Sequence, residues 1–177
     1  MSDLPSFLDF EASSLAPVSY PIEVAWSLAD GSIESHLISP AGIPAWTDWD
    51  PQSQQVHGIQ RDELIAQGRE PSWICRRINQ QLAGKIVYTD NPAFDGMWLA
   101  ALFSVVQNSK PKFRLGLVDD LLFGRAYPNP QARAGDALTR INALKDEARR
   151  RVGGQHRAGW DVQYLIELWK LAGAEKR

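Results

Sequence analysis

The sequence is poor in the residues that stabilise secreted and membrane-bound proteins. One cysteine, Cys75, stands among 177 residues, which excludes an internal disulfide and a cysteine-based zinc cluster. No stretch approaches the roughly 20 apolar residues of a membrane span. The N-terminus has no basic region followed by an apolar run, so we expect no signal peptide. These absences favour a cytoplasmic protein that does not enter a membrane.

An excess of positive charge is also missing. The chain has 19 Lys and Arg against 21 Asp and Glu, which gives a formal net charge of −2. Proteins that capture duplex nucleic acid through their overall field are normally basic, so this class is disfavoured, although a small local site is compatible with the charge. The length fits one domain over residues 1–177, and we find no internal repeat or linker that would divide it.

Hydrophobic periodicity predicts three early strands, followed by strands that alternate with helices. Strands are expected at 7–11, 22–28, 33–39, 85–89 and 113–118, with a two-residue hairpin turn at Asp30–Gly31. Helices are expected at 62–67, 71–82, 93–107, 119–127, 137–151 and 159–171, with loops at 40–58 and 127–134. This order predicts an α/β domain whose mixed five-stranded sheet is antiparallel at one side, parallel at the other, and flanked by helices.

Two carboxylates lie in the apolar segment Phe-Leu-Asp-Phe-Glu at 7–11. In a strand, side chains two positions apart share a face, so we expect Asp9 and Glu11 to lie side by side. Each charge raises the pKa of the other and burial adds to that cost, so a positive partner is expected opposite them. An exposed edge strand with solvated acids is the simpler interpretation of a lone Asp-x-Glu, because short motifs often arise by chance.

Two further acids begin predicted helices. Asp95 lies in the first turn after the strand at 85–89, and Asp161 lies in the first turn of the last helix. A carboxylate stabilises a helix N-terminus, which is a sufficient structural explanation for each acid alone. The end of a strand is also where sites gather in open α/β sheets. His156 lies five residues before Asp161 in a glycine-rich segment, where the backbone is free enough to bring an imidazole over a site. For His36 and His57 the default expectation is a solvated side chain.

Together, four carboxylates offer hard oxygen ligands: Asp9, Glu11, Asp95 and Asp161. Such ligands suit Mg²⁺ or Mn²⁺ and not zinc, because cysteine ligands are absent and only one histidine is near. Two divalent ions about 4 Å apart would clamp both the attacking and the leaving oxygen of a phosphoryl displacement. The acids would then have the positive partner that their positions demand.

The order of these motifs resembles the DEDDh exonucleases, the DnaQ-like group of the ribonuclease H-like superfamily. Motif I resembles residues 7–13, motif II resembles residues 91–95, and motif III resembles residues 156–161, His-Arg-Ala-Gly-Trp-Asp. The spacing of His156 and Asp161 is typical of this subgroup, whose relatives carry tyrosine in the histidine's role. The Val-His-Gly-Ile segment at 56–59 also resembles a segment of the family. The resemblance covers most of the chain and implies a ribonuclease H-like fold.

The resemblance implies a metal-dependent 3′–5′ exonuclease that releases nucleoside 5′-monophosphates from single-stranded DNA or RNA, or from short oligonucleotides. By similarity, Asp9 would bridge two divalent ions, Mg²⁺ or Mn²⁺. Glu11 and Asp161 would help to hold the first ion, and Asp95 would act at the second. His156 would be the general base that deprotonates the attacking water, a role that suits the ordinary pKa of an imidazole, about 6.5.

The same resemblance implies the substrate contacts. The backbone around Ala12 and Ser13 would contact the 3′-hydroxyl. Apolar side chains would pack against the last bases, and the positions that match are Leu15, Ile59 and Phe94. Because stacking contributes roughly 1–3 kcal/mol per base and tolerates any sequence, we expect modest base preference.

Two features depart from the family pattern. Motif II commonly carries His-Asn before its aspartate, whereas residues 90–92 are Asp-Asn-Pro, which adds an acid near the site and stiffens the loop. The segment 124–155 has no detailed match. We interpret its run Arg149-Arg150-Arg151 as a solvated helix end, with contact to a backbone phosphate as the alternative.

Other functions stay open on the sequence alone. The chain could be a non-catalytic nucleic-acid-binding or polymerase-associated module that keeps the fold, although His156 would then have no task. It could also hydrolyse only free nucleotides or dinucleotides. The sequence decides neither between DNA and RNA nor between a monomer and a homodimer. Trp46 and Trp49 are expected to cover the core or their loop.

Overall fold

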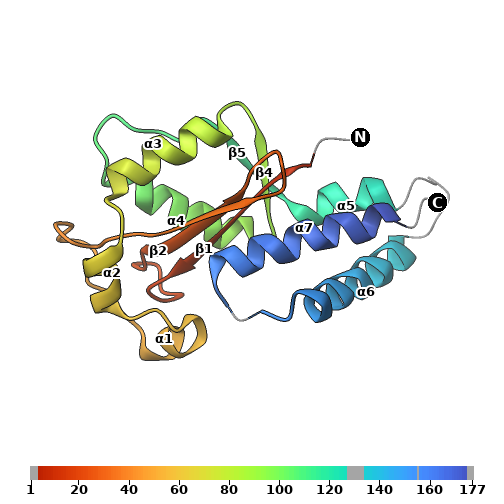
Figure 1. The fold of residues 1–177 in the computed structure, drawn as a ribbon, viewed down its shortest axis with the longest axis horizontal. Coiled ribbons are helices and arrows are strands. Elements are labelled where there is room, and N and C mark those ends of the chain that lie inside the picture. Colours follow the sequence, from red (N-terminus) through yellow and green to blue (C-terminus); the bar gives the residue numbers. More distant parts are fainter. Residues whose placement is uncertain (1–3, 127–133, 155, 175–177) are drawn as a thin grey trace.

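Five strands form one mixed sheet at the centre of the protein (Figure 1). The computed structural model describes residues 4–126, 134–154 and 156–174. The strands are β1 (Ser6–Ala12), β2 (Pro21–Ser27), β3 (Ile33–Leu37), β4 (Ile86–Thr89) and β5 (Arg114–Leu117). Their order is β3-β2-β1-β4-β5, with antiparallel pairing from β1 to β3 and parallel pairing among β1, β4 and β5. The predicted fold class is confirmed, and β1 is the middle strand.

Helices cover both faces of this sheet (Figure 1). They are α1 (Pro51–His57), α2 (Arg61–Gln67), α3 (Pro71–Leu82), α4 (Pro92–Ser104), α5 (Val118–Ala126), α6 (Ala134–Val152) and α7 (Ala158–Ala174). Helices α3 and α4 lie on one face and α7 lies on the other, with α5 and α6 packed against α7. None of the described helices combines the length and the apolar composition needed to cross a bilayer.

The alternation of side chains along β1 serves two cores. Leu8 and Phe10 are buried in the core beneath α3 and α4, whereas Phe7 is buried in the core that α7 forms with α5 and α6. Because side chains two positions apart share a face of a strand, Asp9 and Glu11 lie on the same side as Phe7. The two acids of the central strand therefore face the layer that contains α7.

The hairpin between β2 and β3 has a three-residue loop, so the predicted two-residue turn is wrong. The N–H of Leu28 donates to the carbonyl of Ser32 at 2.8 Å, and the N–H of Gly31 donates to the carbonyl of Leu28 at 3.0 Å. Gly31 has a φ of 86°, the left-handed conformation that closes such loops and that glycine adopts at little cost.

A helix occupies part of the segment 40–58, which was predicted as a loop. Helix α1 begins at Pro51 because the side chain of Asp50 accepts hydrogen bonds from two backbone N–H groups of the first turn, at 3.1 and 3.0 Å. It ends before Gly58, whose φ of 72° is the left-handed conformation common at helix C-termini. The Asp-Pro start and the glycine end were sequence signals of this helix. The loop predicted at 127–134 lies, except for its last residue, outside the described residues.

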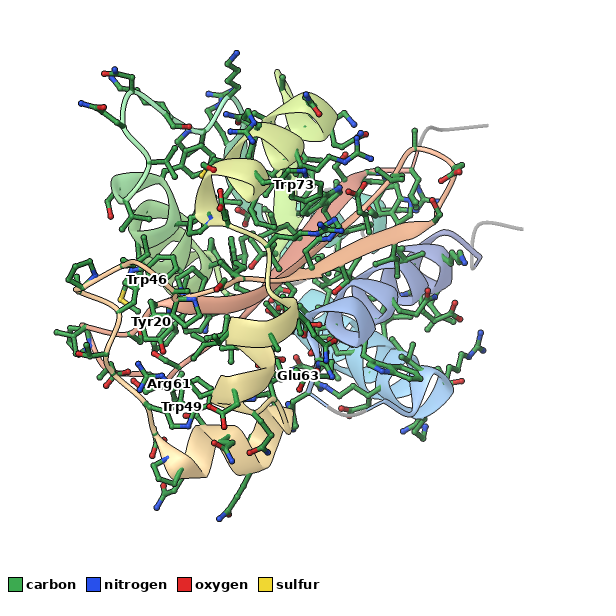
Figure 2. The ribbon with its side chains drawn as sticks, turned by 60° about the vertical axis from the view of Figure 1, so that its left-hand side comes forward. Tyr20, Trp46, Trp49, Arg61, Glu63 and Trp73 are labelled. Carbon is green, nitrogen blue, oxygen red and sulfur yellow. The ribbon has the colours of Figure 1, made fainter. Side chains whose placement is uncertain are left out.

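The two tryptophans of the long loop cover the core beside α2, as predicted (Figure 2). Trp46 is buried and stacks on Tyr20, with ring centroids 5.1 Å apart and planes 7° from parallel. The carbonyl of Trp46 accepts a hydrogen bond from Arg61 at 3.4 Å. Trp49 is half-buried, and its ring N–H donates to the side chain of Gln54 in α1 at 2.7 Å. These contacts fix α1 and α2 against the loop.

Candidate functional site

Five acidic side chains meet where β1 and β4 end. One carboxylate oxygen from each of Asp9, Glu11 and Asp161 lies within 4.8 Å of the others, and we call this group the Glu11 triplet. Asp9, Asp90 and Asp95 satisfy the same distance and form the Asp90 triplet. Asp9 belongs to both triplets, so the five acids form one continuous cluster.

The ends of strands and the starts of helices bring these acids together. Asp161 lies in the first turn of α7, the helix that β1 faces. Asp95 lies in the first turn of α4, directly after β4, where it is buried and accepts a hydrogen bond from the hydroxyl of Thr89. Because the carboxyl ends of parallel strands reach the same edge of a sheet, residues far apart in the sequence become neighbours there.

Burial and mutual repulsion raise the pKa values of the clustered acids, and burial is the larger cause for each. The pKa of Glu11 rises to about 8, with the charges of Asp161 and Glu23 adding to the effect of burial. The pKa of Asp95 rises to about 7 and that of Asp161 to about 6. The pKa of Asp9 lies well above its ordinary value because Asp9 is buried and faces the other carboxylates. Without a cation, part of the cluster therefore holds protons at neutral pH.

The cluster fits a divalent cation that prefers oxygen ligands. Both triplets consist of carboxylates alone, which suits Mg²⁺ or Mn²⁺ better than zinc. The nearby Arg157 lowers the pKa of Glu11, but its guanidinium forms its hydrogen bonds with Glu23. Buried carboxylates that repel one another are costly, and a bound cation would remove that cost.

A cavity of about 320 Å³ opens beside Glu11, and we call it the Glu11 cavity. Leu15, His57 and Trp98 line it, and Leu15 is 68% exposed, so an apolar surface is available there. Phe94 is half-buried and lies against Trp98, with ring centroids 5.5 Å apart.

Two of the residues that the family resemblance assigned to substrate contacts are engaged within the fold. Ile59 is fully buried in the core and does not line the Glu11 cavity. The N–H of Ser13 donates to the carbonyl of Tyr20 at 3.0 Å, and the carbonyl of Ser13 accepts from the N–H of Asp50 at 3.0 Å. Of the predicted pair, Ala12 is the residue that lines the cavity, next to an irregularity in the pairing of β1 with β2.

A second cavity, of about 390 Å³, includes two acids of the cluster, Asp90 and Asp161, in its wall, and we call it the His156 cavity. His156 lies between α6 and α7, is exposed, and lines this cavity. Burial keeps the pKa of Asp161 above its ordinary value, and the neighbouring His156 partly opposes that rise. The cavity also contains Arg149 from α6 and Tyr164 from α7. The structure thus places the predicted histidine in one cavity with one of the predicted acids, Asp161.

Solved structures of exonuclease I share this architecture. Exonuclease I of Methylocaldum szegediense superposes with a TM-score of 0.64 at 18% sequence identity, over 97% of this chain. E. coli exonuclease I gives a TM-score of 0.66 at 17% identity with a bound dA16 oligonucleotide, and 0.63 at 18% with a bound 5cy-dT13 oligonucleotide. Both of these comparisons also cover 97% of this chain.

The chain has the fold of the part of exonuclease I that it matches. This confirms the ribonuclease H-like architecture that the resemblance implied. The chain spans 40–41% of the length of these exonuclease I structures. No protein-family model matches the sequence, and no curated protein matches it.

Within the exonuclease I fold, sequence reasoning missed an ion pair that holds the start of α7. Arg157 donates two hydrogen bonds to Glu23 on β2, at 2.9 and 2.8 Å, and the N–H of Ala158 donates to the same carboxylate at 3.1 Å. Glu23 is paired with Glu11 in the register of β1 and β2. The ion pair therefore anchors the residue that follows His156 beside the acidic cluster. The sequence signal of this ion pair was Glu23, an acidic residue inside the apolar strand predicted at 22–28.

Neither of the other two histidines is a solvated loop residue, so the default expectation for them is wrong. His36 lies on β3 and bonds to Glu34 at 2.8 Å. His57 is 5% exposed, and its Nδ1 accepts a hydrogen bond from the N–H of Ile59 at 3.0 Å. In the neutral ring Nε2 then carries the proton, and Nε2 is buried without a partner among the described residues. Burial lowers the pKa of His57, so this ring is a neutral donor beside the Glu11 cavity.

Proposed function

We propose that this chain is a metal-dependent 3′–5′ exonuclease that hydrolyses the terminal phosphodiester of single-stranded or short nucleic acids. The observation that carries the proposal is the pair of acidic triplets that share Asp9 on the central strand. The fold shared with exonuclease I supports it, because the acids lie near the carboxyl ends of β1 and β4, where α/β folds place their sites.

The acidic cluster would hold the divalent ions of the reaction. Asp9, Glu11 and Asp161 would bind one ion, and Asp9 and Asp95 would bind a second. When bound, Mg²⁺ or Mn²⁺ would neutralise the phosphodiester and stabilise the charge that develops on the attacking and leaving oxygens. The contribution of the chain is to keep these carboxylates close together in a partly buried place.

His156 would act as the general base. Its ring lies in the same cavity as Asp161, and it is exposed, so a water molecule can reach it from solvent. It accepts a proton from the water as that water attacks phosphorus, and the phosphodiester bond to the 3′-oxygen of the penultimate nucleotide breaks. The products are a nucleoside 5′-monophosphate and a strand shortened by one nucleotide with a new 3′-hydroxyl.

The Glu11 cavity would receive the terminal nucleotide. Leu15 and Trp98 offer apolar surface to the base, and the ring of Phe94 packs against that of Trp98. The buried Nε2–H of His57 can donate to an oxygen of the sugar or phosphate, which would satisfy an otherwise unpaired polar group. Stacking and backbone contacts carry little sequence information, so the proposal includes weak base preference.

A 3′-end digestion assay tests the proposal. A 5′-labelled single strand incubated with Mg²⁺ or Mn²⁺ should give a ladder that shortens from the 3′ end. Asp9→Ala should abolish the ladder, and His156→Ala should slow it by roughly 100-fold or more. Asp120→Asn, which changes an exposed acid outside both cavities, should leave the rate unchanged.

The same assay separates this proposal from the other functions. Strand binding with no shortening in either metal would indicate a non-catalytic module. Release of product from dinucleotides alone would restrict the activity to very short substrates. Matched DNA and RNA strands would show which sugar the site prefers, and equal activity of wild type and Asp9→Ala would refute the proposed site.

A further inference from the structure

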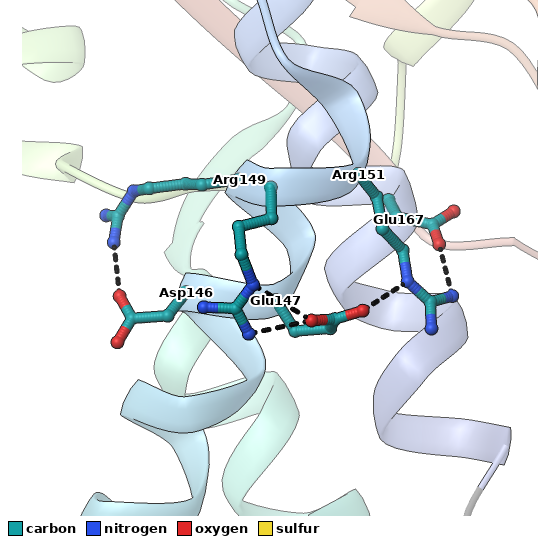
Figure 3. A network of polar contacts seen from close by, with 6 residues as sticks. Asp146, Glu147, Arg149, Arg151 and Glu167 are labelled. Carbon is teal, nitrogen blue, oxygen red and sulfur yellow. Dashed lines mark hydrogen bonds and ion pairs between the residues drawn. The ribbon is translucent and has the colours of Figure 1, made fainter.

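The run of three arginines at the end of α6 divides into two kinds of residue (Figure 3). Arg150 and Arg151 each form a hydrogen-bonded ion pair with Glu147, at 2.7 and 2.8 Å, and Arg151 also reaches Glu167 at 3.1 Å. These two side chains are more than half exposed. They form the solvated helix end that the sequence predicted.

Arg149 differs from its two neighbours. Its contact with Asp146 is long, 3.5 Å, between two side chains that are 61% and 66% exposed, so it contributes little. Its guanidinium carbon lies 5.3 Å from the centre of the Tyr164 ring, and Arg149 lines the His156 cavity together with Asp161. Packing on an aromatic face favours one position of the guanidinium and leaves its N–H groups free to donate.

Tyr164 gives a second, independent sign of a ligand in this cavity. Its side chain is 6% exposed, and its hydroxyl is buried without a hydrogen-bond partner among the described residues. Burial raises the pKa of Tyr164 to about 12, so the hydroxyl keeps its proton and can donate. A buried hydroxyl without a partner is costly, and an acceptor entering the cavity would remove that cost.

A phosphodiester strand and an acidic cluster are both negatively charged, so a positive side chain near the cluster would favour binding of the strand. Among the described residues that line the His156 cavity, Arg149 is the only one with a permanent positive charge. We propose that Arg149 and the Tyr164 hydroxyl together bind one backbone phosphate of the substrate strand, next to the bond that is cleaved. This inference rests on the proposed function. It assigns Arg149 a role in positioning the substrate strand, whereas the sequence alone indicated that Arg149 is part of a solvated helix end.

Binding measurements with a matched control test the inference. A 5′-fluorescein-labelled dT12 strand would be titrated in Ca²⁺, a hard cation that carboxylates accept, and followed by anisotropy. Arg149→Gln should weaken binding about tenfold, because a hydrogen-bonded charge contact is lost. It should also reduce the slope of log K against log salt by about 0.7, the value for one contact to a single strand. Arg150→Gln removes the same charge one residue away and should change binding less than twofold.

A scan of neutral linkages identifies the phosphate. Strands with one methylphosphonate at the first, second, third or fourth linkage from the 3′ end would be compared on wild type and Arg149→Gln. At one linkage the tenfold difference between the two proteins should disappear, because the charge that Arg149 binds is already absent. Tyr164→Phe should weaken binding several-fold and show its smallest effect at the same linkage.

The outcomes separate this inference from the proposed function. Loss of binding in Arg149→Gln with no strand shortening by wild type supports the phosphate contact and refutes the exonuclease. Equal effects of Arg149→Gln and Arg150→Gln, or an undiminished Arg149→Gln effect at all four neutral linkages, overturn the inference even if wild type is an active exonuclease. In Mg²⁺, Arg149→Gln should raise KM and leave kcat within about twofold. A merely structural role of Arg149 would instead lower the melting temperature without raising KM selectively.

Discussion

Glu11→Gln should make the metal-free protein more stable at pH 8. The change replaces a half-buried carboxyl by a neutral amide of the same shape. In the folded state the pKa of Glu11 is about 8, against 4.5 for an unperturbed glutamate, because burial and then the charge of Asp161 disfavour ionisation. The substitution therefore removes a group that resists ionisation in the folded protein.

The sign of the pH dependence follows from this difference. The folded state binds the Glu11 proton more tightly than the unfolded state, so this carboxyl costs no stability below about pH 4.5. Its cost grows as the pH rises toward 8, where the full shift corresponds to about 5 kcal/mol as an upper bound. The difference in unfolding free energy between Glu11→Gln and wild type should therefore increase by several kcal/mol between pH 5 and pH 8.

Urea denaturation in EDTA at several pH values measures this difference. The same substitution at the exposed Glu70 is the control and should show no comparable trend. Added Mn²⁺ should stabilise wild type more than Glu11→Gln at pH 8, because binding to the folded state adds to its stability. A difference between the two proteins that is the same at pH 5 and pH 8 would refute the electrostatic account of the cluster.

Two further tests address how the site is supported. Arg157→Leu removes the ion-pair partner of Glu23, whose side chain is 5% exposed, and should lower the unfolding free energy by about 3 kcal/mol. Adding Glu23→Gln to this variant should restore part of the lost stability. If stability is not restored, the unpaired charge of Glu23 is not the cause of the loss. Asp50→Ala removes the cap of α1 and should cost about 1 kcal/mol in the same urea assay, while an unchanged midpoint would show that packing alone holds this short helix.

The sheet and four of the clustered acids were predictable because their signals are local. Alternating apolar residues mark the early strands, and Asp95 and Asp161 each follow a recognisable break before a helix. Helix α1 was missed although Asp50 and Gly58 mark its ends, because a proline-rich segment with few apolar residues shows no helical periodicity. The position of Ile59 was also hidden, since its burial depends on how α1 and α2 pack against the rest of the fold.

Other parts of the site depend on tertiary contacts that no local pattern carries. Asp90 was noted as an added acid, but its place in a triplet with Asp9 follows from the parallel pairing of β1 with β4. The ion pair of Glu23 with Arg157 joins residues 134 positions apart. Likewise, Arg149 cannot be told from Arg150 by sequence, because the difference between them is which side of α6 faces the Tyr164 ring.

The contact between β2 and the start of α7 has a consequence for the order of events during synthesis. Glu23 is made early, whereas Arg157, His156 and Asp161 are made near the end of the described chain. A nascent chain can pair β1, β2 and β3 by themselves, since these strands are sequential neighbours. Its acidic cluster, however, must wait until α7 has left the ribosome. The proposed nuclease activity would therefore begin only once α7 has docked.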